Sequence, residues 1–130
     1  MTTDLSAENI EELTKAFFSD ISARDWELAI ERLDPDARAV QNISGNEVNA
    51  RELLKSMRGL VESLAHFSYE NPRRIVGKES VVEQHDVRMV RHDGVEVVID
   101  ICIVLRFSSE VLITRIDEYL DSGALQALRN

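Results

Sequence analysis

Hydrophobic and polar positions follow two periods along the chain, and the change falls near residue 67. In the first half, apolar residues recur every three or four positions, which is the spacing of an amphipathic helix. This pattern predicts three helices, each beginning after a residue whose side chain can cap it: Ser6, Asp25 and Asn49. The second helix is expected to end at Asp34-Pro35, because a residue before proline disfavours helix, and the third near residue 65. A short strand is expected over residues 38–43.

From residue 67 onward, apolar and polar residues alternate or form apolar runs, as in strands. Four strands are predicted in succession, at residues 67–76, 80–91, 95–107 and 111–120. Asp93-Gly94 is the clearest turn between them, since both residue types tolerate a positive φ. A short final helix is expected over residues 123–128. Helices followed by an antiparallel meander indicate the α+β class.

The strand predicted at residues 95–107 is almost entirely apolar, and only Glu96, Asp100 and Arg106 interrupt it. Such a run is typical of a strand that is covered on both faces. An aspartate is costly to bury, so its presence there calls for a reason. We expect Asp100 to face a pocket, with its pKa raised by burial and its carboxyl protonated as a hydrogen-bond donor.

Composition narrows the classes of partner. The 130 residues are enough for one domain with one core, and 24 acidic against 15 basic residues give a formal charge of −9. The acidic balance, without a Lys/Arg cluster, argues against nucleic acid or a membrane surface as partner. The single cysteine, Cys102, and a start without signal-peptide features indicate a cytoplasmic protein. No motif for a cofactor is visible, and the three histidines are not spaced as a metal site, so neither is expected.

Several short motifs resemble those of the nuclear transport factor 2-like superfamily, in particular its SnoaL-like branch. They are Ala23-Arg24-Asp25 with Trp26, Asp36-Ala37, Leu105-Arg106-Phe107, and Ile113-Thr114-Arg115-Ile116 continuing to Tyr119-Leu120-Asp121. The resemblance implies a cone: N-terminal helices packed on a curved, mainly antiparallel sheet that encloses one pocket. It also implies cofactor-independent acid/base chemistry, of isomerase, cyclase, dehydratase or hydrolase type, on a mostly apolar or aromatic small molecule.

Two enzyme groups of the superfamily suggest individual site residues. By resemblance to ketosteroid isomerases, Asp100 holds the place of the acid that donates to a developing oxyanion, while the isomerase tyrosine and proton-shuttling aspartate fall on Phe17 and Gln41. By resemblance to limonene-epoxide hydrolases, the water-activating positions fall on Val40, Asn42, Gln84, Asp86 and Glu118. Asn42 and Asp86 match that pattern by identity, and Glu118 keeps a carboxylate.

The strand period alone favours a similar site. It places Gln84, Asp86 and Arg88 on one face of their strand and Asp100 on one face of the next, so the carboxylates would be close, and His85 would point outward. We therefore expect Glu118 as the base and Asp86 as the acid, with Arg88 holding the carboxylates together. The residues expected to be catalytic are Asp86, Glu118, Asp100 and Asn42. The residues expected to contact the substrate are Arg88, Gln84, His66, Trp26, Phe17 and Val40.

This placement also predicts the assembly. If Asp100 faces the pocket, an apolar stripe lies on the opposite, convex face: Ile99, Ile101, Ile103 and Leu105. A stripe so continuous is uncommon on a solvated surface, so a homodimer through the convex face is expected.

Other interpretations stay open at this stage. Asp86, Arg88 and Glu118 could be solvated cross-strand charges, and His66 could be a helix-terminal residue without a role. Phe17 and Trp26 could belong to the core. The whole chain could be a module that only binds a small molecule or dimerises, or an epoxide-hydrolase-like enzyme with an incomplete motif.

Overall fold

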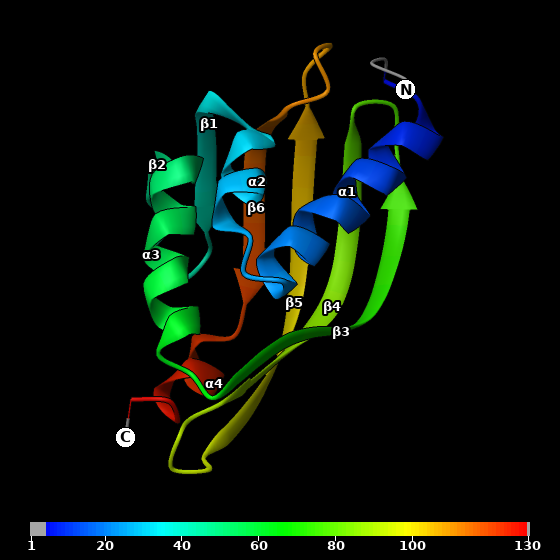
Figure 1. Ribbon diagram of the computed structural model, residues 1–130. Coiled ribbons are helices and arrows are strands. Elements are labelled where there is room, and N and C mark those ends of the chain that lie inside the picture. The colour runs from blue at the N-terminus through cyan, green and yellow to red at the C-terminus, as the bar shows by residue number, and fades with distance from the viewer. Residues whose placement is uncertain (1–4, 130) are drawn as a thin grey trace.

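A computed structural model of the protein describes residues 5–129, in which four helices accompany a six-stranded sheet (Figure 1). The helices are α1 (Ala7–Ser22), α2 (Trp26–Glu31), α3 (Ala50–Glu62) and α4 (Ser122–Gln126). The strands are β1 (Leu33–Gln41), β2 (Glu47–Asn49), β3 (His66–Val76), β4 (Ser80–Val90), β5 (Glu96–Phe107) and β6 (Ile113–Leu120). This arrangement confirms the predicted α+β class.

The strand order in the sheet is β2-β1-β6-β5-β4-β3. Strands β3 to β6 form the predicted antiparallel meander, and the turn between β4 and β5 has Gly94 at φ +90°. Strand β1 pairs in parallel with β6, and β2 adds a short edge strand that the sequence pattern did not predict. The segment between β1 and β6 contains β2, α3 and the first three strands of the meander, so this parallel pair joins residues that are far apart in the chain.

The three predicted helix caps are present. Side-chain oxygens of Ser6, Asp25 and Asn49 each accept a hydrogen bond from a backbone N–H in the first turn of α1, α2 and α3, at 3.1, 3.3 and 3.1 Å. Helix α2 ends earlier than expected. Leu33, predicted to lie in that helix, is instead the buried first residue of β1.

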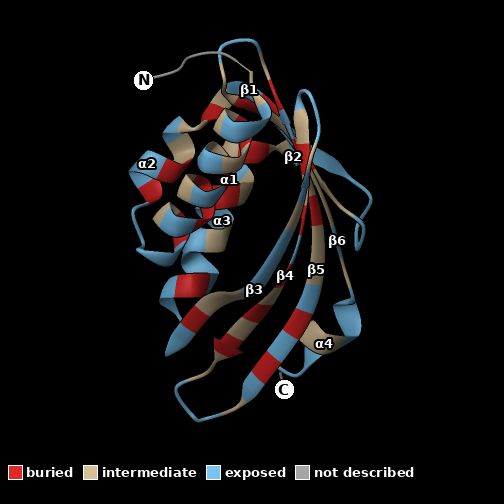
Figure 2. Cartoon of the chain, turned by 90° about the vertical axis from the view of Figure 1, so that its right-hand side faces the viewer, coloured by how far each residue is buried: buried red, intermediate tan, exposed pale blue. Residues whose placement is uncertain are grey.

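The core lies between the helices and the concave face of the sheet, where Figure 2 shows buried positions on both layers. Helix α1 contacts β3 and β4, and α3 contacts β1, and Figure 2 shows α1, α2 and α3 on the same side of the sheet. Ile10, Phe17 and Ile21 of α1 are almost fully buried there, as are Ile103 and Leu105 of β5. The helices and the curved sheet thus form the predicted cone.

Alternation along β4 and β5 shows which residues face the core. The odd-numbered residues of β4 from Val81 to Met89 are buried, and Val97, Ile99, Ile103 and Leu105 of β5 are buried with them. On the other face, Val98 and Asp100 are exposed. The prediction that β5 is covered on both sides is therefore wrong for the single chain, because Val98 and Asp100 on the convex face are left exposed by residues 5–129.

Candidate functional site

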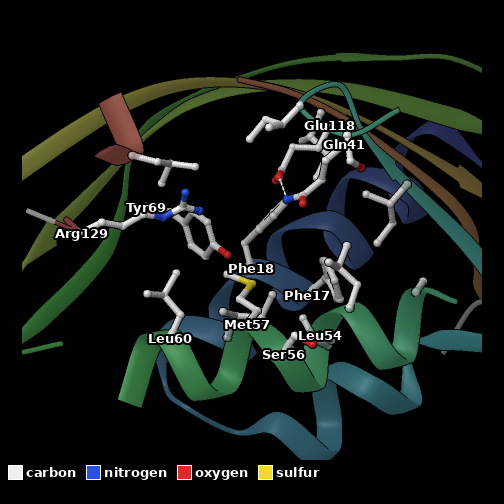
Figure 3. A pocket seen from close by; sticks show the side chains of 18 residues that line it. Phe17, Phe18, Gln41, Leu54, Ser56, Met57, Leu60, Tyr69, Glu118 and Arg129 are labelled. Carbon is white, nitrogen blue, oxygen red and sulfur yellow. Dashed lines mark hydrogen bonds between the residues drawn. The ribbon is translucent and has the colours of Figure 1, made fainter. Parts of the chain in front are cut away.

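A cavity of about 360 Å³ opens between the helices and the concave face of the sheet (Figure 3). Its wall is mainly apolar, with side chains from α1, α3 and the sheet: Phe17, Phe18, Ile21, Leu53, Leu54, Met57, Leu60, Ile103 and Ile116. Such a wall favours an apolar ligand, and the few polar groups in it determine how that ligand is oriented.

The polar wall of the cavity contains Glu118, Gln41 and Tyr69. Gln41 is the residue opposite Glu118 in the β1–β6 pair, and its Nε2 donates a hydrogen bond to Glu118 Oε1 at 2.6 Å (Figure 3). Tyr69 comes from β3, the strand at the far edge of the sheet from β1 and β2, and faces the same cavity. Figure 3 shows its hydroxyl pointing into that cavity. Hydrogen bonds to that hydroxyl are absent within residues 5–129, so it is free to bind a ligand.

Burial sets the protonation of these groups. It raises the pKa of Glu118, an effect that the hydrogen bond from Gln41 and the nearby His85 oppose. The pKa of Tyr69 is raised well above its ordinary value, first by burial and then by the charges of Glu118 and Glu83. Tyr69 therefore stays protonated and is a hydrogen-bond donor, while Glu118 is a stronger proton acceptor than an exposed glutamate.

A buried ionic network lies behind Tyr69. Glu83 accepts a hydrogen bond from Arg74 Nε, and its other oxygen lies 2.6 Å from His85 Nδ1, which donates to it. Glu83 and His85 are each only 1% exposed. The His85 ring packs against Tyr69 and Phe18, with centroids 4.8 and 5.0 Å apart. Sequence reasoning missed this network, although Glu83 and His85 alternate with the apolar residues that form the inner face of β4.

Two of the residues predicted for the site lie in the cavity wall, namely Glu118 and Phe17. Trp26 is buried in the core, and Val40 is on the convex side of β1, opposite Asp117. Asn42 is exposed and exchanges hydrogen bonds with the backbone of Leu120 at 2.9 and 3.0 Å. His66 is exposed, with Nε2 2.9 Å from the hydroxyl of Ser68. None of these last four is among the residues that line the cavity in the described part of the chain.

The remaining predicted residues lie on the convex face, so the expectation that they face the pocket is wrong. Asp86 is directly opposite Asp100 in the β4–β5 pair, and Gln84 and Arg88 flank Asp86 on the same face. Arg88 pairs with Glu96 and not with two carboxylates. The physical reason is the strand period: a shift of one residue moves every side chain to the other face. The same shift brings His85, predicted to point outward, into the core.

The carboxyls of Asp86 and Asp100 form a hydrogen-bonded pair on this face. Asn71 Nδ2 donates to Asp86 Oδ2 at 3.0 Å, and this bond and the one with Asp100 lower the pKa of Asp86. The pKa of Asp100 is raised, as predicted. The main cause is the hydrogen bond to Asp86 and its negative charge, whereas the predicted cause, burial, is secondary because Asp100 is exposed.

Two earlier interpretations lose their basis. The apolar stripe that suggested a homodimer lies on the concave side, where Ile99, Ile103 and Leu105 belong to the core. The epoxide-hydrolase pattern loses Asn42 and Asp86, the two residues that matched it by identity, because neither faces the cavity.

The described residues contain no cluster of three or more His, Cys, Asp or Glu side chains suited to a metal ion. Of the helices within residues 5–129, none has the length and apolar character needed to cross a bilayer.

Solved structures with the same fold align with nearly the whole chain. A protein from Xanthomonas campestris pv. campestris, provisionally named a polyketide cyclase, has a TM-score of 0.80 at 16% identity, covering 93% of this chain and 98% of its own. A nuclear transport factor 2-like protein from Burkholderia xenovorans has a TM-score of 0.78 at 17% identity, covering 97% and 99%. TerC, co-crystallised with polyporic acid, has a TM-score of 0.77 at 18% identity, covering 92% and 97%. No family model and no curated protein matches the sequence.

Proposed function

We propose that this chain, which has the SnoaL-like fold of the nuclear transport factor 2-like proteins, catalyses proton transfer at a carbon next to a carbonyl group. The observation that supports this most is Glu118, a carboxyl with a raised pKa in the wall of an apolar cavity that also contains the free hydroxyl of Tyr69. The substrate would be a mostly apolar, ring-containing small molecule. TerC, a protein with a similar fold, was co-crystallised with polyporic acid, which supports a small-molecule ligand here.

Glu118 is the proposed proton acceptor. Its ionised carboxylate takes the proton from the α-carbon, the electrons of the C–H bond form the enolate double bond, and negative charge moves to the carbonyl oxygen. A positioned base contributes about 10² to 10⁴-fold to such a step. Gln41 fixes the direction of the carboxylate through its 2.6 Å hydrogen bond, which leaves the other oxygen for the substrate.

Tyr69 is the proposed oxyanion donor. A neutral hydroxyl that donates to the enolate oxygen stabilises the charge where it develops, and its raised pKa keeps the proton on Tyr69. The enolate then recovers a proton from Glu118 at the same or a conjugated carbon, or its carbon attacks a second carbonyl of the substrate. Exchange or isomerisation follows in the first case, and ring closure in the second.

The experiment measures exchange of carbon-bound hydrogen for deuterium in 2-tetralone, an apolar ketone with acidic α-hydrogens, by NMR in D₂O. We expect the protein to accelerate exchange, Glu118→Gln to lower the rate by about a hundredfold or more, and Tyr69→Phe to lower it as well. Glu96→Gln, an exposed glutamate on the convex side, is the matched control and should keep the rate. Equal rates in the protein and in Glu118→Gln would exclude Glu118 as the base.

The second candidate is a protein that binds its ligand without changing it. One feature of the cavity favours this alternative. Glu118 is the sole carboxyl side chain among the described residues that line it, so the expected pair of carboxyls, one acid and one base, is not present there. Saturable binding of 2-tetralone, measured by calorimetry, without any acceleration of exchange would support the binding role.

We also propose that the convex face pairs with a second copy of the chain, although through other residues than those predicted. Val98 and Tyr119 are 51% and 55% exposed there, and Tyr119 lies opposite the partly buried Cys102 in the β5–β6 pair. Apolar groups gathered in this way favour contact with another protein surface. Sedimentation should show a dimer at micromolar concentration and a monomer in Val98→Asp; a monomer in both samples would contradict the proposal.

A further inference from the structure

The cavity has a second, narrower lobe of about 130 Å³. The two lobes share six lining residues: Gln41, Met57, Leu60, Tyr69, Glu118 and Leu125. We call this shared part the waist. It contains the proposed base, the residue that orients it and the proposed oxyanion donor, so a group that reacts there has space on both sides.

Beyond the waist, the narrow lobe is lined entirely by apolar side chains in the described part of the chain: Phe67, Val87, Met89, Ile99, Ile101 and Leu120. The wide lobe, in contrast, also reaches Ser44, Ser56 and Arg129. On β5, Ile103 lines the wide lobe and Ile99 the narrow one. Four residues of strand separate them, which corresponds to about 13 Å. The cavity is therefore elongated along the strands, with Gln41, Tyr69 and Glu118 in the middle.

The two volumes differ enough to distinguish ligand groups. An apolar cavity of about 150 Å³ holds one benzene molecule, so a lobe of about 130 Å³ has room for a single ring or a short branched chain. The wide lobe, at about 360 Å³, is more than twice as large and has room for fused rings.

We propose that the substrate is a ketone with two unequal apolar arms. Its carbonyl and the adjacent C–H group lie at the waist between Glu118 and Tyr69, a single ring or short branched chain fills the narrow lobe, and a fused ring system fills the wide lobe. Polar substituents belong on the fused ring system, because only the wide lobe has Ser44, Ser56 and Arg129 in its wall. This inference rests on the proposed function, since it assigns the waist to the reacting atoms.

Three ketones test the shape by calorimetry. 1-(2-Naphthyl)ethanone has only the fused ring system, 1-(2-naphthyl)-2-phenylethanone adds a single ring across the carbonyl, and 1,2-di(2-naphthyl)ethanone puts fused rings on both sides. We expect the phenyl compound to bind about tenfold or more tightly than the first, because a whole ring leaves water. The dinaphthyl compound should lose that gain, because its second fused ring exceeds the narrow lobe.

Two variants change the narrow lobe in opposite directions. Val87→Phe fills it and should remove the tenfold gain of the phenyl ring while leaving the affinity for 1-(2-naphthyl)ethanone unchanged. Ile99→Ala enlarges it and should restore tight binding of the dinaphthyl compound, so the proposal stays testable if Val87→Phe does not fold. Val48→Phe adds the same volume at an exposed position of β2 that lines neither lobe, and it is the matched control for Val87→Phe.

The outcomes separate this inference from the proposed function. Equal affinity for the three ketones would overturn the unequal-arm substrate, even if exchange of the CH₂ hydrogens of 1-(2-naphthyl)-2-phenylethanone depends on Glu118. If the affinities follow the expected order but Glu118→Gln leaves that exchange unchanged, the two-lobed binding site stands and the proposed base is wrong.

Discussion

Gln41 and Glu118 lie opposite each other in the one parallel strand pair among the described residues, and the amide of Gln41 donates to the carboxyl of Glu118 at 2.6 Å. The first of these residues precedes the meander in the chain and the second lies in its last strand. The sheet thus joins the two segments at the cavity wall and gives the carboxyl one fixed partner.

The first prediction concerns this pair. The hydrogen bond from Gln41 lowers the pKa of Glu118, so Gln41→Met should raise that pKa further. Because the proposed base acts in its ionised form, the rise of activity with pH should move to higher pH in the variant. The pH profile of 2-tetralone exchange measures this shift. Gln84→Met, on the convex face, should keep the original profile; the same displacement in both variants would show that Gln41 has no specific effect.

The second prediction links Glu118 to stability. Burial raises its pKa in the folded protein above the value in the unfolded chain, so the folded state holds the proton more tightly. The resulting stabilisation is complete below the unfolded pKa and is lost as pH rises through the folded pKa. The unfolding free energy should therefore fall relative to that of Glu118→Gln as pH rises from the ordinary glutamate pKa, about 4.3, through the raised pKa of the folded protein. Urea unfolding measures it, and a constant difference between the two proteins would contradict the raised pKa.

The third prediction concerns the buried network of Arg74, Glu83 and His85. Glu83→Gln would leave the charge of Arg74 without its partner in the protein interior, where breaking a buried ion pair costs about 3–5 kcal/mol. The midpoint of urea unfolding should fall accordingly. Glu96→Gln breaks the solvated pair with Arg88 and should change it little. A midpoint equally unaffected in both variants would show that the network does not stabilise the fold.

The fourth prediction concerns the carboxyl pair of Asp86 and Asp100. If Asp86 is the main cause of the raised pKa of Asp100, Asp86→Asn should bring that pKa back towards its ordinary range, because the negative charge is removed. Carbon NMR titration of Asp100 in the two proteins measures the change. A pKa that stays raised in the variant would indicate burial, for example in a dimer interface.

Of the two proposed reacting groups, Glu118 and Tyr69, the sequence pointed to Glu118. Glu118 was expected in the pocket as the carboxyl that replaces a family aspartate, and the structure places it in the cavity wall. Tyr69, Glu83 and His85 were not expected there. One signal could have found them: the most apolar face of β5, with Ile99, Ile101 and Ile103, is the natural core face, and strand pairing then directs Glu83 and His85 inward.

The sequence by itself determined the elements of this protein, because caps, periods and turns are local: Ser6, Asp25 and Asn49 begin the three helices, and Gly94 allows the tight turn between β4 and β5. Its motifs also indicated the SnoaL-like fold. Only the tertiary structure decided which face of each strand lines the cavity. Both faces of β4 carry charged and apolar residues, so the period of two permitted either orientation, and the packing of α1 on one side of the sheet selected the face with Glu83 and His85.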